Sequence, residues 1–177
     1  MGEAFDKVAR LLGLPYPGGP EIQKAVERVT EEMKRKFGNK FKLPRPLINE
    51  DNLEMSFSGL KAAIAKIVTG LGKIDEETRD MLAWEFSEAV CEILIKKTMR
   101  AVEMYKPKSV LLAGGVAANK QLRESLKIAV ENADIKFFCP ELKYCGDNAA
   151  MVGAAAIISP HEVKPAELRP DPSVTTV

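Results

Sequence analysis

The N-terminal segment has the hydrophobic spacing of two amphipathic helices. In 2–12, four apolar residues fall on one helical face: Phe5, Val8, Ala9 and Leu12. This spacing predicts a helix that buries one side. Three prolines and two glycines in 15–20 then enforce a tight loop. A second helix should begin near Pro20, because proline lacks an N–H group that would have no partner in the first turn.

The middle of the chain combines loop signals with long apolar periodicity. Two prolines limit 41–47 to an edge strand or an extended loop. Residues 53–57 alternate apolar and polar, which predicts a short strand and, together with 41–47, a small hairpin. Ser58 is expected to cap a helix over 60–69. A helix over 75–105 should follow, and its unusual length allows a break within it.

The C-terminal part has the pattern of a parallel α/β unit. Apolar runs at 109–113 and 135–139 predict short strands, and helices are predicted over 118–130 and 146–158. This order implies at least one parallel strand pair covered by helices. The predicted fold class is therefore α/β and mostly helical. Four prolines predict an extended tail over 159–177.

Composition narrows the class of protein without identifying a partner. The 177 residues suit one domain or one lobe of a larger enzyme. Three cysteines without a CxxC pair argue against a disulfide framework or a structural zinc site, and favour a reducing, cytoplasmic setting. No apolar run reaches the roughly 18 residues of a membrane span. The formal net charge is +1, and the basic run 34–45 is either a solvated surface or a local basic patch.

Two stretches in the first part of the chain could carry chemistry, and each has an ordinary structural alternative. Asp6 could accept hydrogen bonds from ligand hydroxyl groups, and Gly18 with Gly19 would let backbone N–H groups approach a ligand. A simple turn with a solvent-facing aspartate explains the same pattern. The sequence SFSGLK, 56–61, could bind an anion at a helix start, although capping by Ser58 accounts for it equally.

Two further stretches begin predicted helices near the C-terminus. AGGVAAN, 113–119, leaves a predicted strand and enters a helix, which is where open α/β sheets bind nucleotides. It has neither the GxGxxG pattern nor the GxxxxGK pattern of a phosphate-binding loop. Asn119 could bond a ribose or a base edge, or cap the helix. Asp147 could cap the last helix or ligate a metal, but one carboxylate does not make a site and His161 is the only histidine.

Five motifs occur in one order along the chain: GEAFDK, LGLPYPGGP, SFSGLK, AGGVAANKQLR and CGDNAAMVGAA. Together they resemble the tRNA N6-adenosine threonylcarbamoyltransferase family over 2–158. The resemblance implies that 1–158 is a segment of the C-terminal lobe of an actin-like, sugar-kinase-like ATPase fold. It also implies an acyltransferase of tRNA processing. Such enzymes pass a threonylcarbamoyl group from threonylcarbamoyl-adenylate to N6 of the adenosine beside the anticodon.

The resemblance implies roles for individual residues and a set of partners. By motif match, Asp6 and Gly19 would contact the substrate, Asn119 would contact its adenosine part, and Asp147 would be a metal ligand. The complete enzyme would hold one divalent metal, iron or zinc, as Lewis acid and template. Its ligand would be threonylcarbamoyl-adenylate or an adenine nucleotide. The expected partners are tRNA, the N-terminal half and accessory proteins of the threonylcarbamoylation complex, and no membrane is expected.

Two departures from the family pattern affect the expected activity. Gln23 stands where the family often has an acidic residue that touches the ligand. The family's HxxxH metal motif and its glycine-rich phosphate-binding turn belong to a preceding half, which this sequence does not contain. We therefore expect a truncated, C-terminal segment that is inactive without the N-terminal half. The alternative is a non-catalytic nucleotide-binding or assembly module, or one half of a split enzyme. A zinc peptidase, which needs about three protein ligands and a nearby base, has little support.

Overall fold

The computed structural model describes residues 2–160. His161 and all but the first two residues of the expected tail, 159–177, lie outside the described residues. The elements in chain order are α1 (Gly2–Leu11), α2 (Gly18–Glu27), α3 (Glu31–Phe37), α4 (Ser58–Leu71), α5 (Glu76–Tyr105), β1 (Ser109–Leu111), the 3-10 turn η1 (Gly115–Ala118), α6 (Lys120–Glu131), β2 (Lys136–Phe138), the 3-10 turn η2 (Leu142–Tyr144) and α7 (Ala149–Ile158). The mostly helical α/β class is confirmed for this range. None of these helices is long and apolar enough to cross a membrane.

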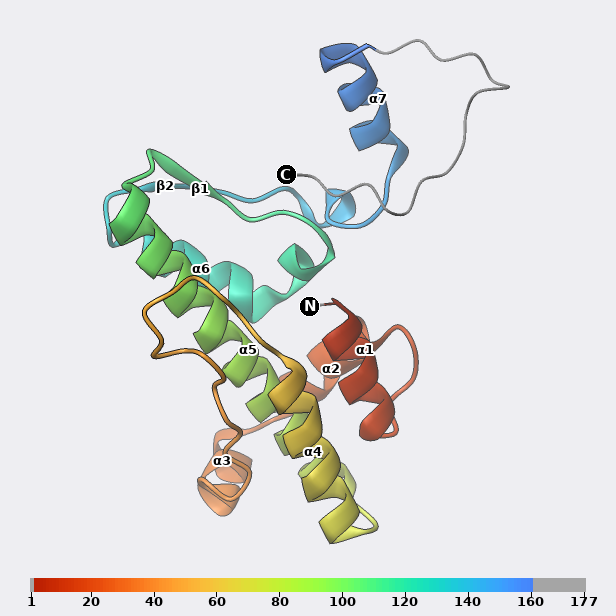
Figure 1. Ribbon diagram of the computed structural model, residues 1–177. Helices are drawn as coiled ribbons and strands as arrows, with labels where there is room; N and C mark the ends of the chain where they lie inside the picture. Colours follow the sequence, from red (N-terminus) through yellow and green to blue (C-terminus); the bar gives the residue numbers. More distant parts are fainter. Residues whose placement is uncertain (1, 161–177) are drawn as a thin grey trace.

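Helix α5 packs against α2, α3, α4 and α6 (Figure 1). Its 30 residues run without the break that the sequence allowed. Asp75 caps its first turn by accepting a hydrogen bond from the Thr78 N–H at 2.8 Å. The helix stays continuous because both of its halves are buried. The first half packs in one hydrophobic cluster with α1, α2 and α4, and the second half packs in another cluster with α6 and the strands.

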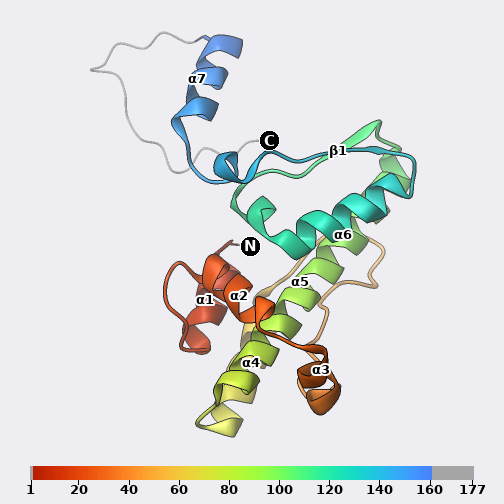
Figure 2. The same cartoon turned by 180° about the vertical axis from the view of Figure 1, so that it is seen from behind.

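The larger hydrophobic core lies between α1, α2, α4 and the first half of α5, as both views of the ribbon show (Figures 1 and 2). Phe5 of α1 meets Phe86 of α5 edge to face, with ring centroids 5.0 Å apart. Arg28, just after α2, donates two hydrogen bonds to the buried Asp80 of α5 at 2.7 and 2.6 Å. These contacts hold α1 and α2 in fixed positions on α5.

The predicted hairpin is wrong, because 41–57 forms loops and turns with no strand. Side chains of α5 satisfy the backbone of this segment in place of a partner strand. The Glu85 carboxylate accepts a hydrogen bond from the Leu43 N–H at 2.9 Å. The buried Lys97 ammonium donates to the carbonyl oxygens of Glu50 and Asn52 at 3.1 and 2.8 Å. These bonds from α5 take the place of sheet partners for the backbone groups of Leu43, Glu50 and Asn52.

Two other helix starts differ from the sequence predictions. The cap position of α4 is Phe57, without a side-chain hydrogen bond, while Ser58 is the first helical residue. Ser58 Oγ is instead paired with Ser56 Oγ at 3.1 Å. Helix α3, which the sequence did not predict, contains the start of the basic run. Lys34 pairs with Glu31 and Lys36 with Glu77, so this part of the run is a solvated, charge-paired surface.

Strands β1 and β2 form a parallel pair joined through η1 and α6, as the sequence predicts. Val110 lies opposite Phe137 in the register, and both pack toward α5 and α6. The other face of the sheet carries Leu111 and Phe138, which are 69% and 53% exposed. The sheet is therefore covered on one face and open on the other.

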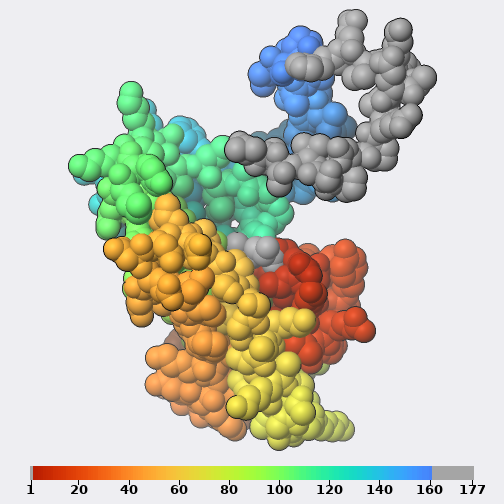
Figure 3. Space-filling view, viewed as in Figure 1, coloured from red at the N-terminus to blue at the C-terminus, as the bar shows by residue number. Residues whose placement is uncertain are grey.

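Helix α7 stands apart from the core helices beyond the two strands (Figures 1 and 3). All ten of its residues are exposed, although its sequence, AAMVGAAAII, contains no charged residue. Ile157 and Ile158 are each 83% exposed. A helix that is apolar all round is normally buried. In this chain the helix has apolar surface with no partner among the described residues.

Candidate functional site

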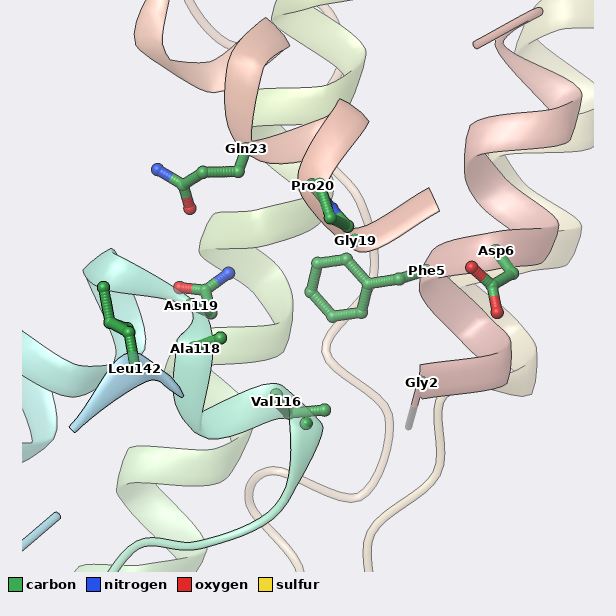
Figure 4. Close-up of a pocket in the computed structure, with 11 residues that line it drawn as sticks. Gly2, Phe5, Asp6, Gly19, Pro20, Gln23, Val116, Ala118, Asn119 and Leu142 are labelled. Atoms are coloured by element: carbon green, nitrogen blue, oxygen red, sulfur yellow. The ribbon is translucent and has the colours of Figure 1, made fainter. Parts of the chain in front are cut away.

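A cavity of about 510 Å³ lies between the first two helices and the start of α6 (Figure 4). Its lining residues are Gly2, Phe5, Asp6, Gly19, Pro20, Gln23, Gly115, Val116, Ala118, Asn119 and Leu142. They come from α1, α2, the η1–α6 junction and η2. Three of the four site residues predicted from the sequence, Asp6, Gly19 and Asn119, are thus brought to one cavity. Asp147 is not among the lining residues.

Asp6 holds the start of α2 against α1. Its Oδ1 accepts a hydrogen bond from the Gly18 N–H at 2.8 Å, and the side chain is half-buried. The cap position of α2 is Pro17, whose side chain makes no cap bond, so Asp6 supplies the missing acceptor from another helix. Asp6 is therefore half-buried and bonded within the turn between α1 and α2, rather than only facing solvent. Its second oxygen, Oδ2, has no hydrogen-bond partner among the described residues and could accept one from a ligand.

The two glycines at the start of α2 have different surroundings. A Cβ on Gly18 would lie 2.6 Å from the Asp6 Cα and 2.7 Å from the Phe5 carbonyl oxygen, so this glycine allows α1 and α2 to touch. A Cβ on Gly19 would meet nothing within 4 Å, and Gly19 lines the cavity. The sequence suggested that both glycines allow a ligand to approach the backbone. Of the two, only Gly19 has the open space at the cavity for this role.

Asn119 serves as a helix cap and also lines the cavity. Its Oδ1 accepts a hydrogen bond from the Leu122 N–H at 2.8 Å, which caps α6. Its Nδ2 makes no hydrogen bond among the described residues and can donate to a ligand acceptor in the cavity. Gly114, just before η1, has φ 84° and ψ 177°, a conformation that glycine adopts far more readily than other residues. This turn sets the direction in which the chain enters α6.

Asp147 does not cap α7. Asn148 does so, accepting a hydrogen bond from the Met151 N–H at 2.9 Å, while Asp147 is exposed. Among residues 2–160 no three His, Cys, Asp or Glu side chains lie close enough together to hold a metal ion. The residues described here therefore do not fit a complete metal centre. Asp147 as a metal ligand stays a prediction that needs ligands from elsewhere.

The chemistry of the cavity is that of a binding site with apolar walls and a few polar groups. Figure 4 shows Phe5, Gln23 and Asn119 approaching the same space from three elements. A cavity of this size and lining suits a small ligand with a few polar groups. The cysteines offer no nucleophile here, because none lines the cavity. Burial, reinforced by the charge of Glu88, also raises the pKa of the Cys91 thiol to about 12.

Several cavity residues escaped the sequence analysis. Phe5 was placed on the core face of its helix, where it does pack, but its ring also forms a wall of the cavity. Pro20 and Val116 lie inside motifs that were singled out for other residues. Leu142 gave no signal, because its segment has no periodicity that would place it against Asn119.

Comparison with known proteins gives the family. The family model for tRNA N6-adenosine threonylcarbamoyltransferase matches residues 1–154. The chain belongs to this family. The resemblance stated from the five motifs is thereby confirmed. All cavity residues of this threonylcarbamoyltransferase family member fall inside the matched range.

Individual relatives bear the same name. The chain is 42% identical over 169 residues to the tRNA N6-adenosine threonylcarbamoyltransferase of Chromobacterium violaceum, covering 93% of this chain and 48% of the relative. It is 46% identical over 156 residues to that of Moorella thermoacetica, covering 88% and 44%. It is 46% identical over 154 residues to that of Thermosipho africanus, covering 87% and 44%. The chain thus spans slightly less than half the length of the threonylcarbamoyltransferases that it matches.

Proposed function

We propose that this chain is the C-terminal segment of a tRNA threonylcarbamoyltransferase and that its cavity receives the adenosine part of threonylcarbamoyl-adenylate. The observation that carries the proposal is the meeting of Asp6, Gly19 and Asn119 at one cavity of about 510 Å³. Asn119 lies at least 100 positions after Asp6 and Gly19 in the chain, yet all three residues were selected by motif match. Their convergence is what a ligand site requires, and it is not needed for helix capping.

Each polar group has a defined task in this proposal. The Nδ2 of Asn119 donates to an acceptor on the base or the ribose, while its Oδ1 stays bound to the Leu122 N–H. The Oδ2 of Asp6 accepts a hydrogen bond from a ligand hydroxyl, and Gly19 lets the ligand approach the backbone of α2. Gln23 has an amide where the family often has a carboxylate, so its side chain can donate a hydrogen bond to a ligand as well as accept one.

The proposed complete enzyme is an actin-like, two-lobed protein of the cytoplasm that acts on tRNA with accessory proteins. Its divalent metal, iron or zinc, would supply Lewis-acid chemistry and would take Asp147 as one ligand. An HxxxH motif of the N-terminal half would supply further ligands. Since 2–160 does not provide a full ligand set, the proposal assigns no catalytic step to this chain by itself. Its own residues bind and orient the adenylate.

The direct test is transfer of the threonylcarbamoyl group to tRNA. The chain should give no turnover by itself and should gain activity when a separately produced N-terminal half carrying HxxxH is added. Asn119→Ser, which keeps a capping oxygen, should lower the reconstituted activity. Robust turnover by the isolated chain would refute the proposed dependence on a second half.

The second candidate function, an assembly module or one half of a split enzyme, has its own support. The open face of the β1–β2 sheet presents Leu111 and Phe138, and α7 presents an apolar surface. Such patches usually mark an interface. The proposed occupant is the N-terminal half, because the chain spans only 44–48% of its relatives. Light scattering after size-exclusion chromatography tests whether the two halves associate. A stable monomer that does not bind the N-terminal half counts against the assembly role.

A further inference from the structure

Arg123 connects two walls of the cavity through its guanidinium group. It lies in α6, four residues after Asn119. Its Nε donates to the Ala117 carbonyl oxygen at 3.1 Å, Nη1 donates to the Pro140 carbonyl oxygen at 2.8 Å, and Nη2 donates to the Cys145 Sγ at 3.2 Å. Ala117 belongs to η1, which forms one cavity wall. Pro140 and Cys145 flank Leu142, which forms another.

The segment 140–145 depends on Arg123 for its position. No residue of η2 is buried, and Leu142 itself is 64% exposed. The backbone hydrogen bonds of the segment are internal, from the Tyr144 N–H to Glu141 and from the Cys145 N–H to Leu142. Among the described residues, the hydrogen bonds that tie this segment to earlier elements come from the Arg123 guanidinium. Within the segment, Cys145 is buried, with 4% of its surface exposed, and Pro140 is half-buried.

We propose that Arg123 is a positioning residue that holds Leu142 in place beside Asn119 and so preserves this wall of the cavity. The identity of the ligand rests on the proposed function, but the clamp itself does not. A guanidinium fits the task because its three nitrogen atoms point rigidly toward three different acceptors. A lysine ammonium at the same position keeps the charge but cannot reach all three groups. Both Arg123→Met and Arg123→Lys should therefore release the segment.

The first measurement needs no ligand. The buried Cys145 thiol reports on the clamp when Cys139 is replaced by serine, and Cys91, which is 3% exposed, is an internal control. Reaction with 5,5′-dithiobis(2-nitrobenzoic acid), assigned by peptide mass spectrometry, should be about tenfold faster at Cys145 in both Arg123 variants, since three hydrogen bonds are reduced or lost. An unchanged or slower rate in Arg123→Met overturns the clamp.

The second measurement tests positioning with AMP as the probe. Titration of the isotope-labelled chain by NMR should show about tenfold weaker AMP binding in Arg123→Met and Arg123→Lys. Lys127→Met, on an exposed part of the same helix, is the matched control for loss of one positive charge and should bind like the wild type. Variants with a reactive Cys145 that bind AMP as tightly as the wild type would overturn the positioning role.

Failure of the proposed nucleotide site can be distinguished from failure of the proposed Arg123 clamp. If the wild-type chain does not bind AMP at all, the proposed nucleotide site is refuted, while the rate at Cys145 still decides whether Arg123 clamps the segment. Circular dichroism of each variant separates local release from unfolding, because the larger core between α1, α2, α4 and α5 lies away from Arg123.

Discussion

Gly18 and Gly19 are neighbours in the sequence but differ in what a side chain would meet. Gly18 allows backbone contact between α1 and α2, since its added Cβ would lie within 2.9 Å of three atoms of α1. Gly19 has open space on the cavity side. A single residue step on a helix changes the facing direction by about 100°, which is enough to move from a helix contact to a cavity.

Alanine at these two positions should therefore give opposite results. Gly18→Ala should lower the free energy of unfolding by about 3 kcal/mol, because backbone atoms of α1 cannot move aside as a side chain could. Gly19→Ala should leave stability nearly unchanged and weaken binding of AMP. Chemical denaturation measures the first effect and NMR titration the second. Equal stability losses in both variants would contradict the assignment of the two glycines.

Asn119 combines a cap and a proposed ligand contact, and substitutions can separate the two. Asn119→Ala removes both and should cost about 1 kcal/mol of stability. Asn119→Ser keeps a capping oxygen, so it should recover most of that stability without recovering AMP binding. Denaturation and AMP titration of the same two variants provide the measurement. If Asn119→Ser binds AMP like the wild type, Asn119 is a cap and nothing more.

At the scale of elements, a polar cluster joins α5 to α6 beside the cavity. Ser87 Oγ donates to the Gln121 Oε1 at 2.8 Å, and the Gln121 Nε2 donates to the Glu88 carboxylate. Burial raises the pKa of the half-buried Glu88, the Gln121 hydrogen bond lowers it, and the nearby charges of Glu92 and Glu85 raise it further. The net direction is upward, so the folded protein holds this proton more tightly than the unfolded chain does.

This pKa shift predicts how stability changes with pH. Between the unfolded-state pKa of Glu88, roughly 4.3, and its higher folded-state pKa, the folded state binds more protons. Stability from this group therefore falls as pH rises through that window. Glu88→Gln, which still accepts from Gln121, should be more stable than the wild type at pH 7, and this advantage should shrink toward pH 4. Thermal melting between pH 4 and pH 7 measures this stability difference. Glu124→Gln, at an exposed position of α6, is the control for removal of one negative charge. An advantage that grows toward pH 4 would contradict the sign.

At the scale of the whole molecule, two apolar surfaces lie at the same end of the structure. The strands β1 and β2 and helix α7 lie at the end of the molecule away from α3 and the far end of α4 (Figure 1). The chain spans slightly less than half the length of its relatives. These apolar surfaces are where we propose that the N-terminal half binds.

Charges introduced into α7 test whether this helix binds the N-terminal half. Val152→Glu with Ile157→Glu should leave the melting temperature of the isolated chain nearly unchanged, because both side chains are exposed, 64% and 83%. The same double variant should weaken association with the N-terminal half by at least about tenfold, since burying a charge in an apolar interface is costly. Sedimentation of mixed halves measures the association. Full association of the charged variant would place the interface elsewhere.

The elements themselves were largely predictable, because helix and strand patterns act over a few residues. Helices α1, α5 and α6 and strands β1 and β2 follow apolar spacing and lie within a few residues of their predicted ranges. Local pattern failed at 53–57, where alternation suggested a strand. The chain just before this segment is held by a long-range partner on α5, because Lys97 donates hydrogen bonds to the carbonyl oxygens of Glu50 and Asn52, and no short sequence window contains that contact. The cap alternative for Asp147 failed for a different reason, because its neighbour Asn148 supplies the cap oxygen of α7.

The sequence by itself determined the family and the residues that deserved testing, because its five motifs are specific and continuous in the chain. Only the tertiary structure decided which of those residues meet. Asp6, Gly19 and Asn119 share a cavity because α2 and α6 both pack on α5 and α1 packs on α2. Leu142 and its clamp by Arg123 appeared only in three dimensions. Contacts between residues far apart in the chain depend on how helices pack, and hydrophobic spacing within one helix does not encode that.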